Sequence, residues 1–224
     1  ASHVEDMFAS LRNHVLILSR DVAMFDACRN FVRTFNSIYF ESPEWVDAEE
    51  IRGKMQSMYS SPAYLAHPLF KKYGAPSTVP AEKLLPEMPD GLLLQYFYIH
   101  DKYNENPVGQ KIKYDYNDLE LAYNSYHKKY HPFIRDLISS FGYRDLLFVA
   151  PEQGTIVYSA NKEMHLGTSL ATGPYSTTNL AECWRQADTA GGRGRGDFVS
   201  IVDFEHFQPS YNEPSAFIGT PVYD

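Results

Sequence analysis

The clearest hydrophobic pattern lies in the first forty residues. Apolar side chains recur there at intervals of three and four residues, which is the spacing of an amphipathic helix with a heptad-like seam. The pattern slips once, around Phe25, and Ser19 or Asp21 can cap a new helix at that point. One long helix and two shorter ones both fit. The seam consists of Phe8, Leu11, Val15, Leu18, Val22, Phe25, Cys28, Val32, Phe35 and Tyr39.

This seam has two possible partners. An amphipathic helix normally buries its apolar stripe against its own domain. A seam with heptad spacing also suits pairing with the same helix of a second subunit. We expect packing within the chain together with some contact in a homodimer.

Residues 41–140 predict further helices, separated by proline-rich loops. Seven prolines between Pro43 and Pro89 leave room only for short helices, such as one over residues 48–59. The apolar run Leu92–His100 fits a helix or a buried strand.

A tyrosine-rich helix is expected over residues 118–140. Pro132 removes a backbone donor inside it and should kink it or start a second helix. The side chains expected to point inward are Leu121, Phe133, Leu137 and Ile138.

The pattern changes after Gly142, where short apolar runs are separated by turn residues. Two strands joined by Pro151–Gly154 predict a β-hairpin, and a helix, a glycine-rich connector and two more strands follow. The expected strands are 145–150, 155–159, 198–204 and 215–222, the helix is 178–190 and the connector is 190–197. A helical half followed by strands indicates the α+β class, in three segments: 1–40, 41–140 and 141–224.

Composition narrows the class of protein. The chain has 224 residues, of which 44% are hydrophobic, and a formal net charge of −8. A chain this acidic is a poor candidate for binding nucleic acid, which attracts basic surfaces. The sequence has no apolar stretch near the ~20 residues of a membrane span and no signal peptide. We therefore expect a soluble piece, excised from a longer protein.

Motifs for catalysis and cofactors are missing from the sequence. Cys28 and Cys183 are too few and too far apart for a zinc ribbon or a CxxC centre; they are expected as two buried thiols, with a disulfide as the alternative. The stretch Gly191–Gly196 lacks the GK[ST] ending of a phosphate loop, and the chain contains no GxSxG elbow. We expect neither an enzyme nor a cofactor.

Two histidines, His127 and His131, are spaced to share one face of the tyrosine-rich helix. This spacing can place two imidazoles on one metal ion or haem, with His100, His165 or a carboxylate as the third ligand. Lys128 and Lys129 stand where an HExxH motif needs an acid. Structural hydrogen bonds near Pro132 are the preferred interpretation, and metal binding is the alternative.

From Tyr123 onward, the chain resembles the extracytoplasmic sensor domains of bacterial transmembrane receptors. These are Cache domains, found in methyl-accepting chemotaxis proteins and in receptor cyclases and kinases. Residues 1–40 and 98–109 also look similar. The segments that carry the resemblance are Tyr126–Pro132, Phe141–Phe148, Gly154–Ser159, Lys162–Glu163, Gly167–Leu170, Gly173–Tyr175, Asn179–Ala181, Val202–Phe204, Pro209–Tyr211 and Pro214–Val222.

This resemblance implies a PAS-like antiparallel sheet behind a long N-terminal helix. It further implies a periplasmic domain of an inner-membrane receptor that binds a small organic acid, amino acid or amine and signals toward the membrane. The rival interpretation is a dimerisation module that binds no ligand. One departure is that similar domains continue past Val222–Asp224 into another apolar strand, which is absent here.

In similar domains the ligand pocket lies over the sheet. Lys162 can pair with a ligand carboxylate, and Asp203 with an amine or hydroxyl; Tyr175 and Asp203 can instead fix loops through the backbone. Arg135 and Arg144 are expected in surface salt bridges. The predicted ligand-binding residues are Tyr158, Lys162, His165, Tyr175, Asp203 and Tyr211.

Overall fold

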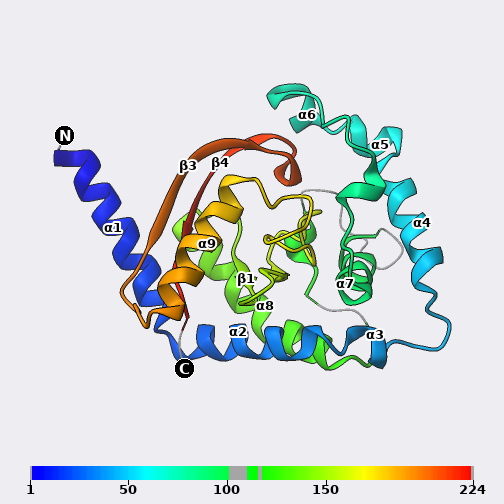
Figure 1. Cartoon of the computed structure of the whole chain (residues 1–224), viewed down its shortest axis with the longest axis horizontal. Coiled ribbons are helices and arrows are strands. Elements are labelled where there is room, and N and C mark those ends of the chain that lie inside the picture. The colour runs from blue at the N-terminus through cyan, green and yellow to red at the C-terminus, as the bar shows by residue number, and fades with distance from the viewer. Residues whose placement is uncertain (1, 101–109, 116–117, 223–224) are drawn as a thin grey trace.

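The computed structural model describes residues 2–100, 110–115 and 118–222 (Figure 1). The N-terminal pattern forms two helices, α1 (Ser2–Ser19) and α2 (Val22–Phe35). The break lies at Asp21, whose carboxylate accepts hydrogen bonds from the backbone N–H groups of Ala23 and Met24 at 2.9 and 3.1 Å. Asp21 is therefore the cap, and the two-helix alternative is correct.

The break also shifts the buried face of α2 away from the predicted seam. Val22 is 74% exposed and Tyr39 is 51% exposed, so both were wrongly placed in the seam. A new helix begins with its own rotational phase, so the spacing on α1 cannot be extended into α2. The buried face is formed by Met24, Ala27, Asn30, Phe31, Thr34 and Phe35.

Short helices fill the proline-rich region, as expected. They are α3 (Ile38–Glu41), α4 (Ala48–Tyr59), α5 (Pro62–Leu65), α6 (Pro68–Tyr73) and the 3₁₀ helix η1 (Ala81–Leu84). Proline is the first residue of α5 and α6, where its missing N–H costs no helical hydrogen bond. The predicted bounds of α4 are confirmed.

Two longer helices complete the helical half, with the 3₁₀ helix η2 (Lys111–Lys113) between them. The apolar run is a helix, α7 (Pro89–Ile99), and the tyrosine-rich segment is α8 (Ala122–Phe141). Helix α8 continues through Pro132. Phe133 is 44% exposed, so its predicted inward orientation is wrong.

The strands form two antiparallel hairpins in the described residues. Strand β1 (Leu147–Val149) pairs with β2 (Ile156–Ser159), and β3 (Ser200–Phe207) pairs with β4 (Glu213–Gly219). The first hairpin was predicted, as were the two later strands, whose bounds are shifted by a few residues. The chain is therefore α+β.

Helix α9 (Asn179–Gly192) lies against the β3–β4 hairpin, whereas α1 extends away from the rest of the molecule (Figure 1). Thr178 caps α9 by accepting the N–H of Ala181 at 3.3 Å. The predicted connector begins too early, because residues 190–192 still belong to α9. The 3₁₀ helix η3 (Gln208–Ser210) joins β3 to β4.

Both cysteines are free thiols, so the two-thiol interpretation is confirmed. None of the helices in the described ranges is long and apolar enough to cross a bilayer. One hydrophobic core extends from Met24 on α2 to Tyr211 after η3 and draws on all three predicted segments.

Helix α7 packs backbone to backbone against the segment that follows β2. A methyl group on Gly91 of α7 would lie 2.3 Å from the carbonyl oxygen of Gly167. The amide nitrogen of Gln95, one turn along α7, donates to the carbonyl oxygens of Met164 and Leu166 at 2.7 and 2.8 Å. Segment 160–170, which carries several predicted site residues, is thus held firmly against α7.

We expect Gly91→Ala to reduce the free energy of unfolding by about 1–3 kcal/mol, because the added methyl group has no space. Gly53→Ala is the matched control, since Gly53 also lies in a helix and its added methyl group would meet nothing within 4 Å. The control should be neutral or stabilising by up to about 1 kcal/mol. Urea denaturation measures both, and equal effects of the two substitutions would contradict the tight contact.

Candidate functional site

Lys162 is the most unusual of the predicted site residues. Its backbone has a φ of 53°, in the left-handed region that side chains rarely adopt. The turn is held by Asp145, which accepts the N–H of Asn161 at 3.0 Å and the hydroxyl of Ser159 at 2.8 Å. The Lys162 side chain is directed inward from this turn, and the residue is only 2% exposed.

The ammonium group of Lys162 ends beside α8. Its Nζ lies 3.0 Å from His131 Nε2 and 3.2 Å from the carbonyl oxygen of Ala160. Among the described residues, no carboxylate forms an ion pair with it. Burial lowers the pKa of Lys162 well below 10.5, and the more distant Asp145 and Asp115 oppose this only in part.

His131 has more neighbours than its ring can satisfy. Its Nδ1 lies 2.6 Å from the Tyr158 hydroxyl, and its Nε2 lies 2.7 Å from the Ile112 carbonyl oxygen as well as close to Lys162. If Nε2 carries the proton, it donates to Ile112 and cannot accept from Lys162. If Nδ1 carries it, the Ile112 carbonyl loses its donor. Each neutral tautomer leaves one polar contact unmade.

His127 stacks on His131, with ring centroids 4.4 Å apart. Its Nδ1–H donates to the carbonyl oxygen of Asp115 at 2.5 Å, which leaves Nε2 as a buried acceptor to which the described residues offer no donor. Burial and the nearby Lys162 lower the pKa of His127, and the pKa of His131 falls to about 3. Both rings are therefore neutral near pH 7.

The stacked histidines do not form a metal site with their described neighbours. Stacked rings do not direct their lone pairs at one point, and no group of three or more metal-binding side chains occurs within residues 2–100, 110–115 and 118–222. The predicted hydrogen bonds are present instead. We call Tyr158, Lys162, His127 and His131 the Lys162 cluster.

Further positive charge lies near this cluster. Lys111 in η2 is buried, and its charge contributes to lowering the pKa of Lys162. Arg135 on α8 forms an ion pair with Asp115 at 2.5 Å, as the sequence predicted for this residue. The carboxylates of Asp145 and Asp115 act on the charge of Lys162 more strongly than Arg135 and Lys111 do, so the charges around the cluster are mixed, and the buried ammonium itself is the feature that suits an anion.

His165 lies apart from the Lys162 cluster, against the ring of Phe207. Neither of its ring nitrogens has a hydrogen-bond partner within the described residues, and Asp145 Oδ2 lies 3.7 Å from Nε2. Burial lowers its pKa to about 3, so the ring is neutral near pH 7 and forms no ion pair with Asp145.

Tyr211 belongs to an aromatic group beside α5 and α6, whereas the ring of Tyr175 lies against Phe207. Tyr211 stacks on His67 with centroids 3.9 Å apart and also contacts Tyr64 and Phe70. The Tyr175 hydroxyl is buried, and the described residues offer it no partner. Asp203 lies elsewhere, exposed on β3, where its carboxylate accepts the N–H of Phe204 at 2.7 Å. In the structure Asp203 therefore bonds to the backbone, which was the alternative to ligand binding that the sequence left open for it.

Sequence reasoning missed two residues that organise these groups. Gln95 is fully buried and also accepts the Tyr59 hydroxyl at 3.2 Å; its signal was a lone amide within an apolar run. Lys111 is the buried neighbour of the Lys162 cluster, and nothing in the local sequence distinguishes it from an exposed lysine.

Comparison of the chain with protein-family models, with curated proteins and with solved structures gives no match. The assignment of a function therefore depends on the geometry described above and on the residues of the chain itself.

Glu163, next to Lys162, gives the fold a pH dependence. Burial raises its pKa to about 7, although its carboxylate pairs with Arg144 at 2.8 Å and accepts the Ser210 hydroxyl at 2.6 Å. The folded state therefore holds this proton more tightly than the unfolded state, whose value is 4.5. The contribution of Glu163 to the free energy of unfolding is therefore present in full below pH 4.5. It is lost as the pH rises from 4.5 through 7, because the unfolded chain ionises first.

Between pH 4.5 and pH 8, the free energy of unfolding of wild-type protein should fall by up to about 3 kcal/mol more than that of Glu163→Gln, which cannot ionise at this position. Urea denaturation of both proteins across this range measures the difference. The exposed Glu82→Gln is the control for loss of a surface carboxyl. A constant difference between wild type and Glu163→Gln would contradict the raised pKa.

Proposed function

We propose that this chain is a sensor domain that binds a small organic acid at the Lys162 cluster. The observation that carries the proposal is the buried ammonium of Lys162, which lacks a carboxylate partner among the described residues. A buried, unpaired charge costs several kcal/mol. A ligand carboxylate would supply the missing counter-charge, and a ligand hydroxyl could donate to Nε2 of His127, which has no partner among the described residues.

The Ile112 carbonyl occupies the acceptor position beside His131. We suggest that the ligand carboxylate takes this place and that η2 moves aside. Such a change needs only that the ligand favours the open arrangement over the closed one. The conflicting hydrogen bonds around His131 make the closed arrangement easier to leave.

The cluster is in contact with the helix that would carry a signal. The Tyr158 ring stacks on Phe31 of α2 with centroids 4.5 Å apart, and Phe31 also stacks on Phe148 of β1. A ligand that displaces His131 or Tyr158 would shift the β1–β2 hairpin against α2. Helix α1 precedes α2, and only Arg20 and the cap Asp21 separate them, so we propose that movement passes along the N-terminal helices toward a membrane.

The ends of β1 and β4 support a PAS-like arrangement of the two hairpins. Arg144, three residues before β1, forms an ion pair with Glu213 at the start of β4, so both strands begin at the same end. In the described residues, β1 pairs only with β2 and β4 pairs only with β3. Each of these two strands therefore has one free edge at which a further strand, placed between them, could pair. We propose that such a strand joins the hairpins into one antiparallel sheet, as in the sensor domains that the sequence resembles.

Location and partners are also part of this proposal. We place the domain in the periplasm, as part of a membrane-anchored receptor of the chemotaxis type. The exposed apolar residues on α1, among them Met7, Phe8 and Ile17, would pair with a second copy. A dimerisation module that binds no ligand would share this helix contact but would not explain the buried ammonium.

A panel of small carboxylates, amino acids and amines should reveal the ligand by thermal shift. We expect at least one carboxylate to stabilise wild-type protein, and Lys162→Met to weaken its binding by about 10–100-fold through loss of a charge-assisted hydrogen bond. Isothermal titration calorimetry measures the loss. The exposed Lys71→Met is the control and should bind normally.

Lys162→Met should also leave the free energy of unfolding unchanged or raise it by about 1–2 kcal/mol, because an apolar side chain replaces a desolvated cation. A purely structural lysine would instead destabilise the fold when removed. No response of wild-type protein to any compound would contradict the proposal and favour the module without a ligand.

The affinity for a carboxylate should depend on pH. The anion binds the protonated lysine, whose pKa in the free protein lies well below 10.5, so binding raises that pKa and takes up protons. The dissociation constant should therefore rise between pH 6 and pH 10, by at most about tenfold per pH unit. Calorimetry in two buffers of different ionisation enthalpy measures the proton uptake, and a constant affinity without uptake would exclude Lys162 as the partner.

A further inference from the structure

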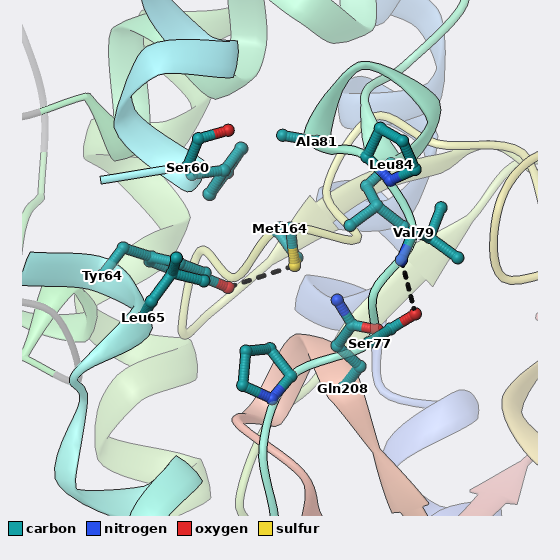
Figure 2. Close-up of a pocket in the computed structure, with 12 residues that line it drawn as sticks. Ser60, Tyr64, Leu65, Ser77, Val79, Ala81, Leu84, Met164 and Gln208 are labelled. Carbon is teal, nitrogen blue, oxygen red and sulfur yellow. Dashed lines mark hydrogen bonds between the residues drawn. The ribbon is translucent and has the colours of Figure 1, made fainter. Parts of the chain in front are cut away.

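A cavity whose chemistry differs from that of the Lys162 cluster lies beside Met164 of segment 160–170, between the end of α4, α5 and η1 (Figure 2). Its volume is about 190 Å³. Figure 2 shows Tyr64, Met164 and Gln208 around it, with Ala81 on the opposite wall. The lining consists of Tyr59, Ser60, Tyr64, Leu65, Pro76, Ser77, Val79, Pro80, Ala81, Leu84, Met164 and Gln208.

The walls of this cavity are tied to the core. Tyr59 donates its hydroxyl to Gln95 Oε1 at 3.2 Å, and the amide of Gln95 holds the Met164 carbonyl at 2.7 Å. Two walls that come from α4 and from the segment after β2 are therefore fixed by one buried amide. Such a cavity is largely formed before any ligand arrives, as in most small-molecule sites.

The lining offers polar groups but no charge. None of its residues is acidic or basic, so an ion would lose its hydration without gaining a counter-charge. Among the described residues, the Tyr64 hydroxyl donates to the sulfur of Met164 at 3.1 Å, which is a weak acceptor that a ligand oxygen can replace. The side-chain amide of Gln208 adds both a donor and an acceptor.

We propose that this cavity binds a compact, uncharged organic molecule with an apolar body and one amide or hydroxyl group. The volume is below the roughly 300–1,000 Å³ of typical ligand pockets, which favours a small molecule. The apolar body packs against Leu65, Val79 and Leu84, and the polar group meets Tyr64 and Gln208. This site is separate from the Lys162 cluster, so an organic acid and a neutral molecule bind at different places.

The segment after β2 connects the two sites. Met164 lines the neutral cavity and lies two residues after Lys162. A molecule in the cavity therefore contacts the same short segment that positions the buried lysine.

Three probes of matched shape test the proposal: butyramide, butyrate and butylammonium. They are titrated into isotopically labelled Lys162→Met protein, which lacks the proposed partner for carboxylates. We expect saturable NMR shifts at Met164, Ala81 and Gln208 with butyramide, and at least tenfold weaker binding of both ions. Equal or tighter binding of either ion, or no binding of butyramide, would overturn the proposal.

Two substitutions test the location. Ala81→Leu fills part of the cavity and should weaken butyramide binding at least tenfold, whereas Ala63→Leu on the exposed face of α5 should not. Gln208→Leu removes the amide but keeps the volume of the cavity nearly unchanged. It should weaken the binding of butyramide and leave the binding of an apolar probe such as cyclopentane unaffected. Unchanged butyramide binding in both Ala81→Leu and Gln208→Leu would show that the molecule binds elsewhere.

Discussion

The buried ammonium of Lys162 is the interaction on which the functional account depends. Desolvation opposes its charge, and no carboxylate among the described residues forms an ion pair with it. The chain nevertheless places it inward through a left-handed turn that Asp145 holds in position. A fold that maintains both the strained turn and the costly burial gains nothing in stability from either, which is the usual sign of a functional residue.

The surroundings of Lys162 show why this position suits a sensor. His127 and His131 lie on α8, Tyr158 lies on β2, and Tyr158 contacts Phe31 on α2. One small group of side chains thus joins the β1–β2 hairpin to α2 and α8. A ligand that resolves the conflicting hydrogen bonds of His131 would change the packing of all three elements together, and such coupling is what a receptor domain needs.

Much of the local structure could be predicted from the sequence. The cap of α2 was narrowed to Ser19 or Asp21, and the bounds of α4 were identified, because capping residues and prolines act locally. The β1–β2 hairpin was identified because its turn is explicit. The buried face of α2 and the orientation of Phe133 could not be predicted in the same way. They depend on the phase at which each helix starts and on the elements packed against it.

The candidate site was predicted in part. Tyr158 and Lys162 meet at His131, whereas Tyr211 stacks on His67, Tyr175 lies against Phe207, and Asp203 is at the surface. Proximity in sequence indicates which strand a residue follows, but not the side of the segment to which it turns. Lys111 and Gln95 reach their positions through contacts between distant segments, for which a single sequence carries little signal.

The pKa of Lys162 is the most direct test of this account. Lysine labelled with ¹³C at Cε is titrated by NMR in ligand-free protein, and the Lys162 resonance is assigned from its loss in Lys162→Met. The account predicts a pKa for Lys162 well below its ordinary value of 10.5, with the other lysines titrating separately. A Lys162 that titrates near 10.5 would show that its charge is hydrated or already paired, and the proposed anion site would lose its basis.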